Sequence, residues 1–181
     1  MVGTRHILGL TIDDAGVVAT ELRIRSGQAE IRRTGEFLWE QELSGENAGA
    51  LGQQLRQFLR DHGFSSKRAV VGLAAKWVLA KEIDAPPAGA DALAGMLSIQ
   101  AERAFSLNAG ELVFDYYGKV NPSEKCQVLL LAARRQIVEQ VKELAGAAGL
   151  RVQSITVSAL ACSRASSQTS PQAVSWRRRM S

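Results

Sequence analysis

Three consecutive stretches with strand-like alternation open the chain, and their very short connections constrain the fold more than any other feature. Residues 6–13 read HILGLTID, residues 17–25 read VVATELRIR, and residues 28–38 form the third stretch. Apolar side chains on both faces of the first stretch indicate a strand that is buried on both sides. The connecting segments DDAG and SG consist of residue types that favour tight turns. The sequence therefore predicts a three-stranded antiparallel meander.

A helix and a fourth strand follow the meander. Apolar residues recur at helical spacing between residues 51 and 59, and Gly63 is a suitable left-handed cap for that helix. Residues 68–73 read RAVVGL and are a short apolar strand candidate. Trp39 and Trp77 flank this part of the chain, and we expect both to anchor its core or its interface with the next part. Three strands, a helix and a strand predict a compact α/β unit.

A second group of elements has a different order of strands and helices. It reads strand, helix, strand, strand, and is followed by an amphipathic helix and a last strand. The elements are expected at residues 77–84, from Asp91 onward, at 111–120, at 126–133, at 137–148 and at 151–157. No segment of the chain approaches the roughly 20 apolar residues that a membrane-spanning helix requires.

We expect an α/β fold with three parts. Residues 1–74 together with 150–161 form the first subdomain, and residues 75–149 form an inserted subdomain. Residues 162–181 are rich in serine and have no periodicity, so they cannot bury enough apolar surface to offset their chain entropy. That segment is expected to be a disordered basic tail.

The basic net charge is a local property of this tail. Up to Ala161 the chain has 18 Lys and Arg residues against 18 Asp and Glu residues, so the net charge of +4 comes from the tail. The four excess cations are Arg164, Arg177, Arg178 and Arg179. The sequence therefore gives no argument for a nucleic-acid partner of the folded part. Cys126 and Cys162 stand far apart without other ligand residues, which favours a reducing, cytoplasmic location.

The order of several short segments resembles one protein family. The segments are LGLTIDDAGVVATEL at 8–22, KEIDAP at 81–86, FDYYG at 114–118 and VLLLAARRQIVEQVKELAGAAGLRV at 128–152. Their order and spacing resemble the N-terminal half of the actin-like PilM proteins of type IV pilus assembly, which are relatives of FtsA, and also the cytoplasmic domain of GspL. The resemblance covers residues 7–160. It implies an actin-like (ribonuclease H-like) first subdomain with an inserted strand-helix-strand-strand subdomain, and a second lobe that is absent.

The resemblance also draws attention to the turn between the first two strands. Actin-like ATPases carry a phosphate hairpin of the form Asp-x-Gly-Ser/Thr at this place. Here Thr11 stands in place of the Asp and Asp13 in place of the Gly, followed by Asp14 and Gly16. A hydroxyl is a weaker magnesium partner than a carboxylate, and Asp13 adds negative charge where a phosphate must approach. The resemblance with these departures implies no ATPase activity, and ATP or magnesium binding only if a second lobe is supplied.

An interaction role is what the resemblance then implies. PilM-like proteins capture the N-terminal tail of the membrane protein PilN between the first and the inserted subdomain, and the inserted subdomain is a common site of self-association. We therefore expect a non-catalytic adaptor in a type IV pilus or type II secretion machine, located at the cytoplasmic face of the inner membrane. An edge strand that accepts another backbone would explain either kind of contact.

Two other interpretations remain open from the sequence. Ribonuclease H-like nucleases also open with a meander, and they hold two metal ions with several carboxylates. Asp13, Asp84 and Glu102 are the acids that such a nuclease would use here. The same Asp13 is, however, an ordinary residue for the tip of a β-turn, together with Asp14. The other alternative is a truncated ATPase fragment with no independent activity.

Overall fold

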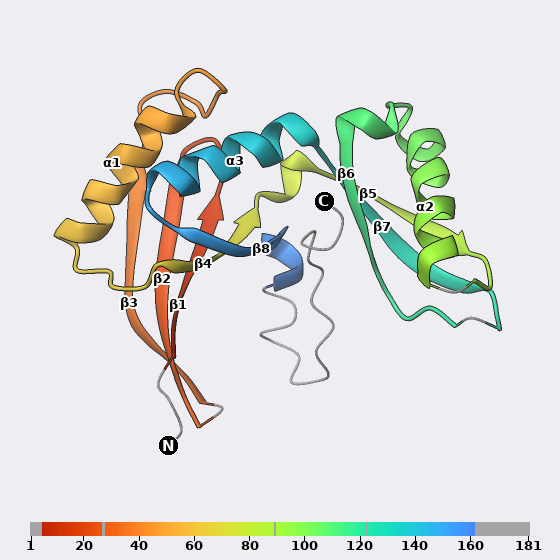
Figure 1. Ribbon diagram of the computed structural model, residues 1–181, viewed down its shortest axis with the longest axis horizontal. Helices are drawn as coiled ribbons and strands as arrows, with labels where there is room; N and C mark the ends of the chain where they lie inside the picture. Colours follow the sequence, from red (N-terminus) through yellow and green to blue (C-terminus); the bar gives the residue numbers. More distant parts are fainter. Residues whose placement is uncertain (1–4, 27, 89, 122, 162–181) are drawn as a thin grey trace.

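The meander at the start of the chain forms one side of a larger sheet. The computed structural model describes residues 5–26, 28–88, 90–121 and 123–161 (Figure 1). Strands β1 (Arg5–Ile12), β2 (Gly16–Arg25) and β3 (Gln28–Leu38) are antiparallel neighbours. Strand β1 also pairs in parallel with β4 (Arg68–Leu73), which pairs in parallel with β8 (Arg151–Val157). The resulting five-stranded sheet has the order β3-β2-β1-β4-β8.

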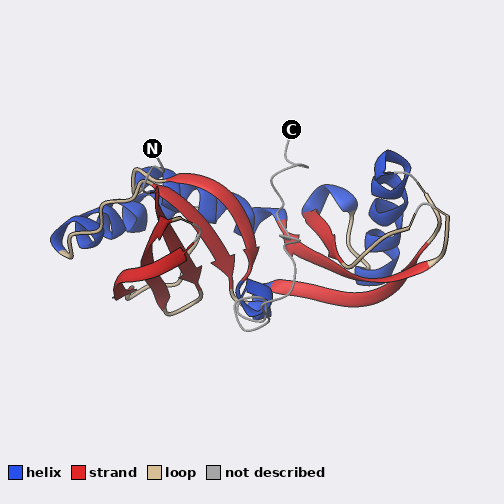
Figure 2. Ribbon diagram, turned by 90° about the horizontal axis from the view of Figure 1, so that it is seen from below, coloured by secondary structure: helices blue, strands red, loops and turns tan. Residues whose placement is uncertain are grey.

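Two helices cover one face of this sheet. They are α1 (Ala48–Asp61) and α3 (Arg135–Ala147), and they lie side by side (Figures 1 and 2). The helices approach closely at Gly52, where a Cβ atom would lie 2.4 Å from the Leu144 carbonyl oxygen and 2.6 Å from the Ala147 Cβ. Any side chain at this position would therefore force the helices apart. We call strands β1–β4 and β8 with α1 and α3 the five-stranded unit.

The rest of the chain forms a smaller sheet with one helix. Its elements are η1 (Ala75–Trp77), β5 (Val78–Ala85), α2 (Ala90–Phe105), η2 (Ala109–Glu111), β6 (Leu112–Tyr117) and β7 (Cys126–Arg134). The three-stranded sheet is antiparallel with the order β5-β7-β6. Figure 2 shows this part lying beside the five-stranded unit along the long axis of the molecule. We call strands β5–β7 with α2 the three-stranded unit.

The two units share a hydrophobic core at their junction. The main core contains the buried side chains of β1, such as Leu8 and Leu10, together with the inner faces of α1 and α3. The same cluster continues into Val113 of β6 and into Leu131 and Ala133 of β7. A second, smaller cluster lies between α2 and the other face of the three-stranded sheet. The junction is therefore packed with apolar side chains.

Helix α3 follows the three-stranded sheet in the chain and packs beside α1. It packs through Val138, Val141 and Leu144 into the core of the five-stranded unit. The helical periodicity identified the helix but could not show which sheet its apolar face covers. The expected disordered tail at 162–181 lies outside the described residues. None of the described helices is long and apolar enough to span a bilayer.

Candidate functional site

The carboxylate of Asp13 closes the turn between β1 and β2. Its Oδ1 atom accepts hydrogen bonds from the backbone N–H of Ala15 at 2.8 Å and of Gly16 at 3.1 Å. The backbone N–H of Asp13 donates to the Gly16 carbonyl oxygen at 3.1 Å. Asp13 is therefore held by the amides of its own turn, as its residue type favours.

Asp14 connects this turn to two other parts of the molecule. Its carboxylate forms an ion pair with Lys76 in η1, the short helix that leads into the three-stranded unit. Its carbonyl oxygen accepts a hydrogen bond from the indole Nε1 of Trp39 at 2.6 Å. Trp39 is buried in the main core, as expected from the sequence, and its backbone N–H donates to the Ala15 carbonyl oxygen at 3.2 Å. The turn is thus fixed from both sides.

Gly16 and Thr11 have structural explanations of their own. Gly16 has a φ of +156°, and a Cβ atom there would lie 2.1 Å from the Phe37 carbonyl oxygen. The glycine is therefore required by the close approach of β2 to β3. Thr11 is exposed near the end of β1, where it is paired with Val18 on one side and with Gly72 on the other.

The residues of this hairpin do not fit a nucleotide phosphate. A phosphate loop needs backbone N–H groups that are directed at the ligand. Here the N–H groups of Ala15 and Gly16 already donate to the Asp13 carboxylate. A phosphate would have to displace this carboxylate from its own turn and would then lie beside two negatively charged side chains, those of Asp13 and Asp14.

The three acids of the nuclease alternative lie in different elements. Asp13 belongs to the β1–β2 turn, whereas Asp84 lies in β5 with its Oδ2 atom 3.1 Å from the Nζ of Lys125. Glu102 lies in α2 and lines a shallow hollow of about 370 Å³ near η2. Within residues 5–26, 28–88, 90–121 and 123–161, no three His, Cys, Asp or Glu residues are grouped in a way that could hold a metal ion.

Arg135 fastens the junction between the units at the point where the chain returns to the five-stranded unit. The guanidinium of Arg135, at the start of α3, donates from Nε to the Gly110 carbonyl oxygen at 2.8 Å and from Nη2 to the Leu112 carbonyl oxygen at 3.0 Å. Ser158, just after β8, donates from Oγ to the Leu73 carbonyl oxygen at 2.9 Å. The two Arg135 hydrogen bonds hold the units in a defined relative position, whereas the Ser158 hydrogen bond joins the ends of β8 and β4 within the five-stranded sheet.

Two large apolar side chains remain exposed near this junction. Val18 lies in β2 close to the hairpin, and Leu79 lies in β5 just after η1, and each is 40% exposed. The ion pair between Asp14 and Lys76 joins the turn that precedes β2 to the short helix η1 that precedes β5. We call Val18 and Leu79, with the segments around them, the junction surface. Neither residue was singled out in the sequence, because alternation alone does not tell which apolar face of a strand stays uncovered.

A second exposed apolar feature lies at the C-terminal end of β3, beside the β1–β2 turn. Leu38 is 70% exposed, and together with Trp39 and Leu51 it lines a hollow of about 360 Å³ between the end of β3 and the start of α1. Strand β3 is at the edge of the five-stranded sheet, so its outer backbone groups face away from the sheet.

A buried carboxylate holds the other end of the same sheet together. Glu21 of β2 is fully buried, and its Oε1 atom accepts hydrogen bonds from Ser65 N at 2.9 Å, Ser65 Oγ at 2.7 Å and Ser66 N at 2.7 Å. Its Oε2 atom lies 3.3 Å from the Nε of Arg33 in β3. Burial raises the pKa of Glu21, but these hydrogen bonds and the Arg33 guanidinium outweigh burial and hold the pKa below its usual range. Sequence analysis missed this residue because Glu21 has the spacing of an ordinary strand residue.

Comparison with known proteins identifies the family. The sequence profile of the family described as type IV pilus assembly protein PilM matches residues 9–175. The chain belongs to the PilM family. A search of the curated protein sequences finds no significant match.

Two solved structures have a similar fold. One is a chain of the PilM-PilN type IV pilus biogenesis complex, with a TM-score of 0.72 and 23% identity over 86% of this chain. The other is the cytoplasmic domain of EpsL, an inner membrane component of the type II secretion system of Vibrio cholerae, with a TM-score of 0.61 and 16% identity over 87% of this chain. This PilM-family chain spans 48% of the first and 59% of the second of these chains.

Proposed function

We propose that this PilM-family chain is a non-catalytic adaptor in the assembly of a type IV pilus or a type II secretion machine. In this role it binds the cytoplasmic tail of a membrane protein related to PilN, at the inner-membrane face. One observation carries the proposal. In this PilM-family chain, the carboxylate of Asp13 accepts hydrogen bonds from the backbone amides of its own turn. Its members are described as type IV pilus assembly proteins, and this hairpin leaves interaction as the role that the geometry supports best.

At the level of the fold, we propose that the five-stranded unit is an actin-like first subdomain and the three-stranded unit an inserted one. The support is the sheet order β3-β2-β1-β4-β8, in which a meander is followed by two parallel strands. Helix α1 connects β3 to β4, and α3 leads into β8. Each helix therefore precedes a parallel strand, and both helices lie on the same face of the sheet. The inserted unit enters through η1 and leaves into α3.

The proposal includes the absence of nucleotide chemistry. Catalysis on a nucleotide needs positioned phosphates and a metal ion. The turn amides already donate their hydrogen bonds to the Asp13 carboxylate, and the Asp14 carboxylate forms an ion pair with Lys76. The expected role of these residues is to set the position of η1 relative to the sheet, and thereby the geometry of the junction.

The partner tail is proposed to bind at the junction surface. An extended peptide gains affinity from apolar side chains that leave water and from backbone hydrogen bonds to strand edges. Val18 and Leu79 offer apolar contacts from the two units. Because the shared core and the Arg135 hydrogen bonds fix the units, this surface is formed before the partner arrives.

The test uses the full chain and a labelled synthetic peptide of the cytoplasmic N-terminal segment of the PilN-type protein from the same organism. Fluorescence anisotropy measures the affinity for wild type, Val18→Glu and Leu79→Glu. A carboxylate buried without a partner is costly, so each substitution is expected to weaken binding at least about tenfold. Ile99→Glu is the matched control, because Ile99 is an exposed apolar residue of α2 away from the junction, and it should bind as wild type does.

Each other outcome counts against a defined part of the proposal. If wild type does not bind the peptide, the adaptor function is wrong for this partner. If Val18→Glu and Leu79→Glu bind as tightly as Ile99→Glu, the junction surface is not the docking site. A parallel Leu38→Glu variant then shows whether the hollow at the end of β3 takes that role.

A further inference from the structure

Positive charge gathers at one end of the five-stranded unit, and the sheet topology explains why. Strands β1, β4 and β8 are parallel and begin at this end, while β2 ends there and β3 begins there. Exposed cations occupy these strand ends and the neighbouring face of α1. They are Arg5, Arg32, Arg56, Lys67, Arg68 and Arg151, which we call the basic end. Sequence analysis found a balanced charge in this part of the chain because the acids are distributed over other surfaces.

The residues of the basic end are neighbours in space although they come from distant parts of the chain. Arg68 and Arg151 are register partners at the start of β4 and β8, and the Arg151 N–H donates to the Lys67 carbonyl oxygen at 2.7 Å. A Cβ atom on Gly149, in the turn before β8, would lie 3.8 Å from the Nε of Arg56. The basic end therefore extends continuously from β8 to α1.

The same contacts continue toward the other side of the sheet. Ser66, next to Lys67, donates from Oγ to the carbonyl oxygen of His6, the residue after Arg5. The imidazole of His6 lies within 3.5 Å of the Arg32 guanidinium, measured between Nδ1 and Nη1. The basic end thus crosses the whole width of the sheet, from β8 through β4 and β1 to β3.

Few acids neutralise this surface. Glu21 is fully buried and is held by Ser65, Ser66 and Arg33. Glu30 is paired with Arg23 at 2.5 Å. None of the six cations of the basic end forms an ion pair with another residue in the part of the chain that the structure describes. Their charge is therefore available to a partner.

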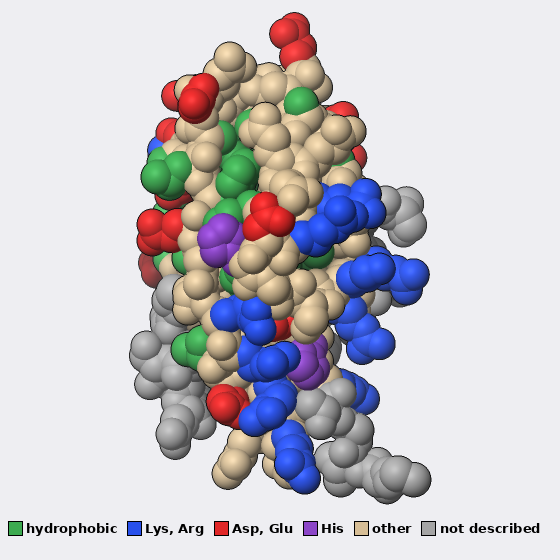
Figure 3. All heavy atoms as spheres, turned by 90° about the vertical axis from the view of Figure 1, so that its left-hand side faces the viewer, with side chains coloured by type: hydrophobic (Ala, Val, Ile, Leu, Met, Phe, Trp, Pro, Cys, Tyr) green, Lys and Arg blue, Asp and Glu red, His purple; other side chains and the backbone are tan. Residues whose placement is uncertain are grey.

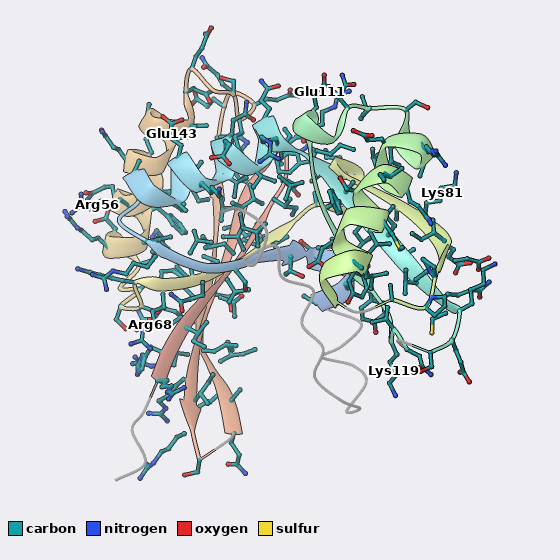
Figure 4. All side chains as sticks on the ribbon, turned by 45° about the vertical axis from the view of Figure 1, so that its right-hand side comes forward. Arg56, Arg68, Lys81, Glu111, Lys119 and Glu143 are labelled. Carbon is teal, nitrogen blue, oxygen red and sulfur yellow. The ribbon has the colours of Figure 1, made fainter. Side chains whose placement is uncertain are left out.

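The figures show the segregation directly. In Figure 3 the Lys and Arg side chains gather over the lower part and the right-hand side of the face, and most Asp and Glu side chains lie at the top and on the left. The acidic loop after β3 contains Glu40, Glu42 and Glu46 and lies at the opposite end of the unit. Figure 4 shows Arg56 and Arg68 on the five-stranded unit, whereas Lys81 and Lys119 belong to the three-stranded unit.

An exposed aliphatic residue lies among these cations. Ile31 precedes Arg32 in β3 and is 64% exposed. Ile31 is the register partner of Leu22, whereas Arg33 is the partner of Glu21. Arg32 is therefore the extra residue of a β-bulge in β3. Interfacial membrane binding uses an exposed apolar side chain beside cations, because the cations attract anionic headgroups while the apolar group enters the interface.

We propose that the basic end binds the surface of an anionic phospholipid bilayer. The cations are spread over a broad, exposed end of a sheet, which suits a planar array of headgroups. Binding of single-stranded nucleic acid relies on exposed aromatic rings for stacking, and the exposed large apolar residue here is an isoleucine. The inference goes beyond the proposed adaptor function and does not depend on it, because lipid contact would orient the chain whether or not a partner tail is bound.

The test is co-sedimentation of the full chain with vesicles of phosphatidylethanolamine and phosphatidylglycerol, compared with vesicles of phosphatidylcholine. Wild type is expected to bind the anionic vesicles, with an affinity that falls as salt is added, and to leave the neutral vesicles unbound. The double variant Arg68→Glu/Arg151→Glu should bind at least about tenfold more weakly, since each cation near such a surface contributes about 1 kcal/mol. Ile31→Ser should weaken binding about threefold or more.

The matched control is Lys81→Glu/Lys119→Glu, which makes the same change in net charge on the three-stranded unit and should bind as wild type does. All variants are compared in a second background with Arg177, Arg178 and Arg179 replaced by serine, so that the tail does not dominate binding. Circular dichroism confirms that each variant is folded.

Three results would overturn the inference. One is equal vesicle binding by the two double variants in the serine background. Another is binding to phosphatidylcholine vesicles that matches the binding to anionic ones. The third is a wild-type chain that ignores anionic vesicles but binds a DNA duplex at the same salt concentration, with loss in Arg68→Glu/Arg151→Glu, which would assign the basic end to nucleic acid. None of these results depends on the PilN-type peptide, so this inference and the proposed function fail independently.

Discussion

The five-stranded and the three-stranded units use the same kinds of elements but bury them to very different extents. In the five-stranded unit, α1 and α3 pack against each other and against the sheet, and the cluster includes side chains from all of these layers. In the three-stranded unit, one helix covers one face of the sheet. Among the described residues, its buried cluster consists of Ala85, Leu93, Leu97, Ala101, Val128 and Leu130. A core of that size gives little stability by itself. The smaller unit therefore depends on the shared junction.

This difference also explains where apolar surface remains exposed. Helix α1 is brought to its neighbour through Gly52, so its apolar face is covered. Among the described residues, α2 has no other α-helix packed along it, and Met96 and Ile99 on it remain exposed. At Gly95 a Cβ atom would meet nothing within 4 Å. The five-stranded unit is therefore a tightly packed scaffold that positions the more loosely packed three-stranded unit.

The largest effect is expected from removing a side chain from the main core. Leu10→Ala should destabilise the whole chain, because Leu10 lies between the sheet and its helices. The loss in the free energy of unfolding should be near the upper end of the range of about 2 to 5 kcal/mol. Leu97→Ala should cost less and should mainly increase local opening of α2. Urea unfolding combined with hydrogen exchange measures both. Equal global losses, without local opening of α2, would contradict the difference between the units.

The next effect concerns the buried carboxylate of the scaffold. Glu21→Gln should reduce the free energy of unfolding by about 2 to 3 kcal/mol at neutral pH, because it weakens the hydrogen bonds from Ser65 and Ser66 and leaves Arg33 without its partner. Arg33 is half-buried and can be partly solvated, which limits the loss. Thermal unfolding followed by circular dichroism measures the difference.

The pH dependence of Glu21 has a definite sign. Because its pKa is lowered in the folded state, its stabilisation is complete above the ordinary glutamate pKa of about 4.3 and is lost as the pH falls through the lower folded-state pKa. The stability difference between wild type and Glu21→Gln should therefore shrink as the pH falls below about 4. A difference that grows on acidification would show that the carboxylate is not stabilised by these partners.

A smaller pair of effects compares two helical glycines, Gly52 of α1 and Gly95 of α2. Gly52→Ala should destabilise the chain by about 1 to 3 kcal/mol, because its Cβ atom would collide with the backbone of α3. Gly95→Ala in α2 has open space and should stabilise the chain by up to about 1 kcal/mol through helix propensity. Denaturant titrations of the two variants should thus move in opposite directions. Two shifts of the same sign would mean that α1 and α3 are not in close contact.

The smallest effect is expected at the exposed ion pair of the hairpin. Asp14→Asn removes the charge that pairs with Lys76, and such exposed pairs contribute less than about 1 kcal/mol. The expected change in unfolding free energy is therefore close to zero. The affinity for the partner peptide should fall more clearly, because η1 loses its contact with the turn. If the dissociation constants of wild type and Asp14→Asn differ by less than a factor of about two, Asp14 does not position η1 for binding.

Much of the fold could be predicted because local patterns of apolar and polar residues determine its strands and helices. The alternation in residues 6–13, 17–25 and 28–38 predicted the meander, and the helical spacing around Leu51 and Ile137 predicted the two helices of the scaffold. Trp39 was expected to anchor the core, and it does. What the patterns could not supply was the partner of each apolar face, such as the packing of α3 beside α1.

The candidate site was less predictable because it depends on contacts between distant segments. The sequence indicated Thr11, Asp13, Asp14 and Gly16 as a degraded phosphate hairpin. The alternative interpretation of Asp13 as a turn residue agrees with its hydrogen bonds to the turn amides, but the sequence did not reveal that Gly16 is required by Phe37. The basic end was hidden for a related reason, since its residues come from separate strands and helices and become neighbours only when the sheet forms.

The most direct test is a calorimetric titration of the PilN-type tail peptide into the full chain, first without nucleotide and then with millimolar Mg-ATP. If the hairpin is closed by Asp13 and the chain acts as an adaptor, the peptide binds in both cases with the same dissociation constant. Peptide binding that appears only with Mg-ATP, or that tightens several-fold when it is added, would contradict this account.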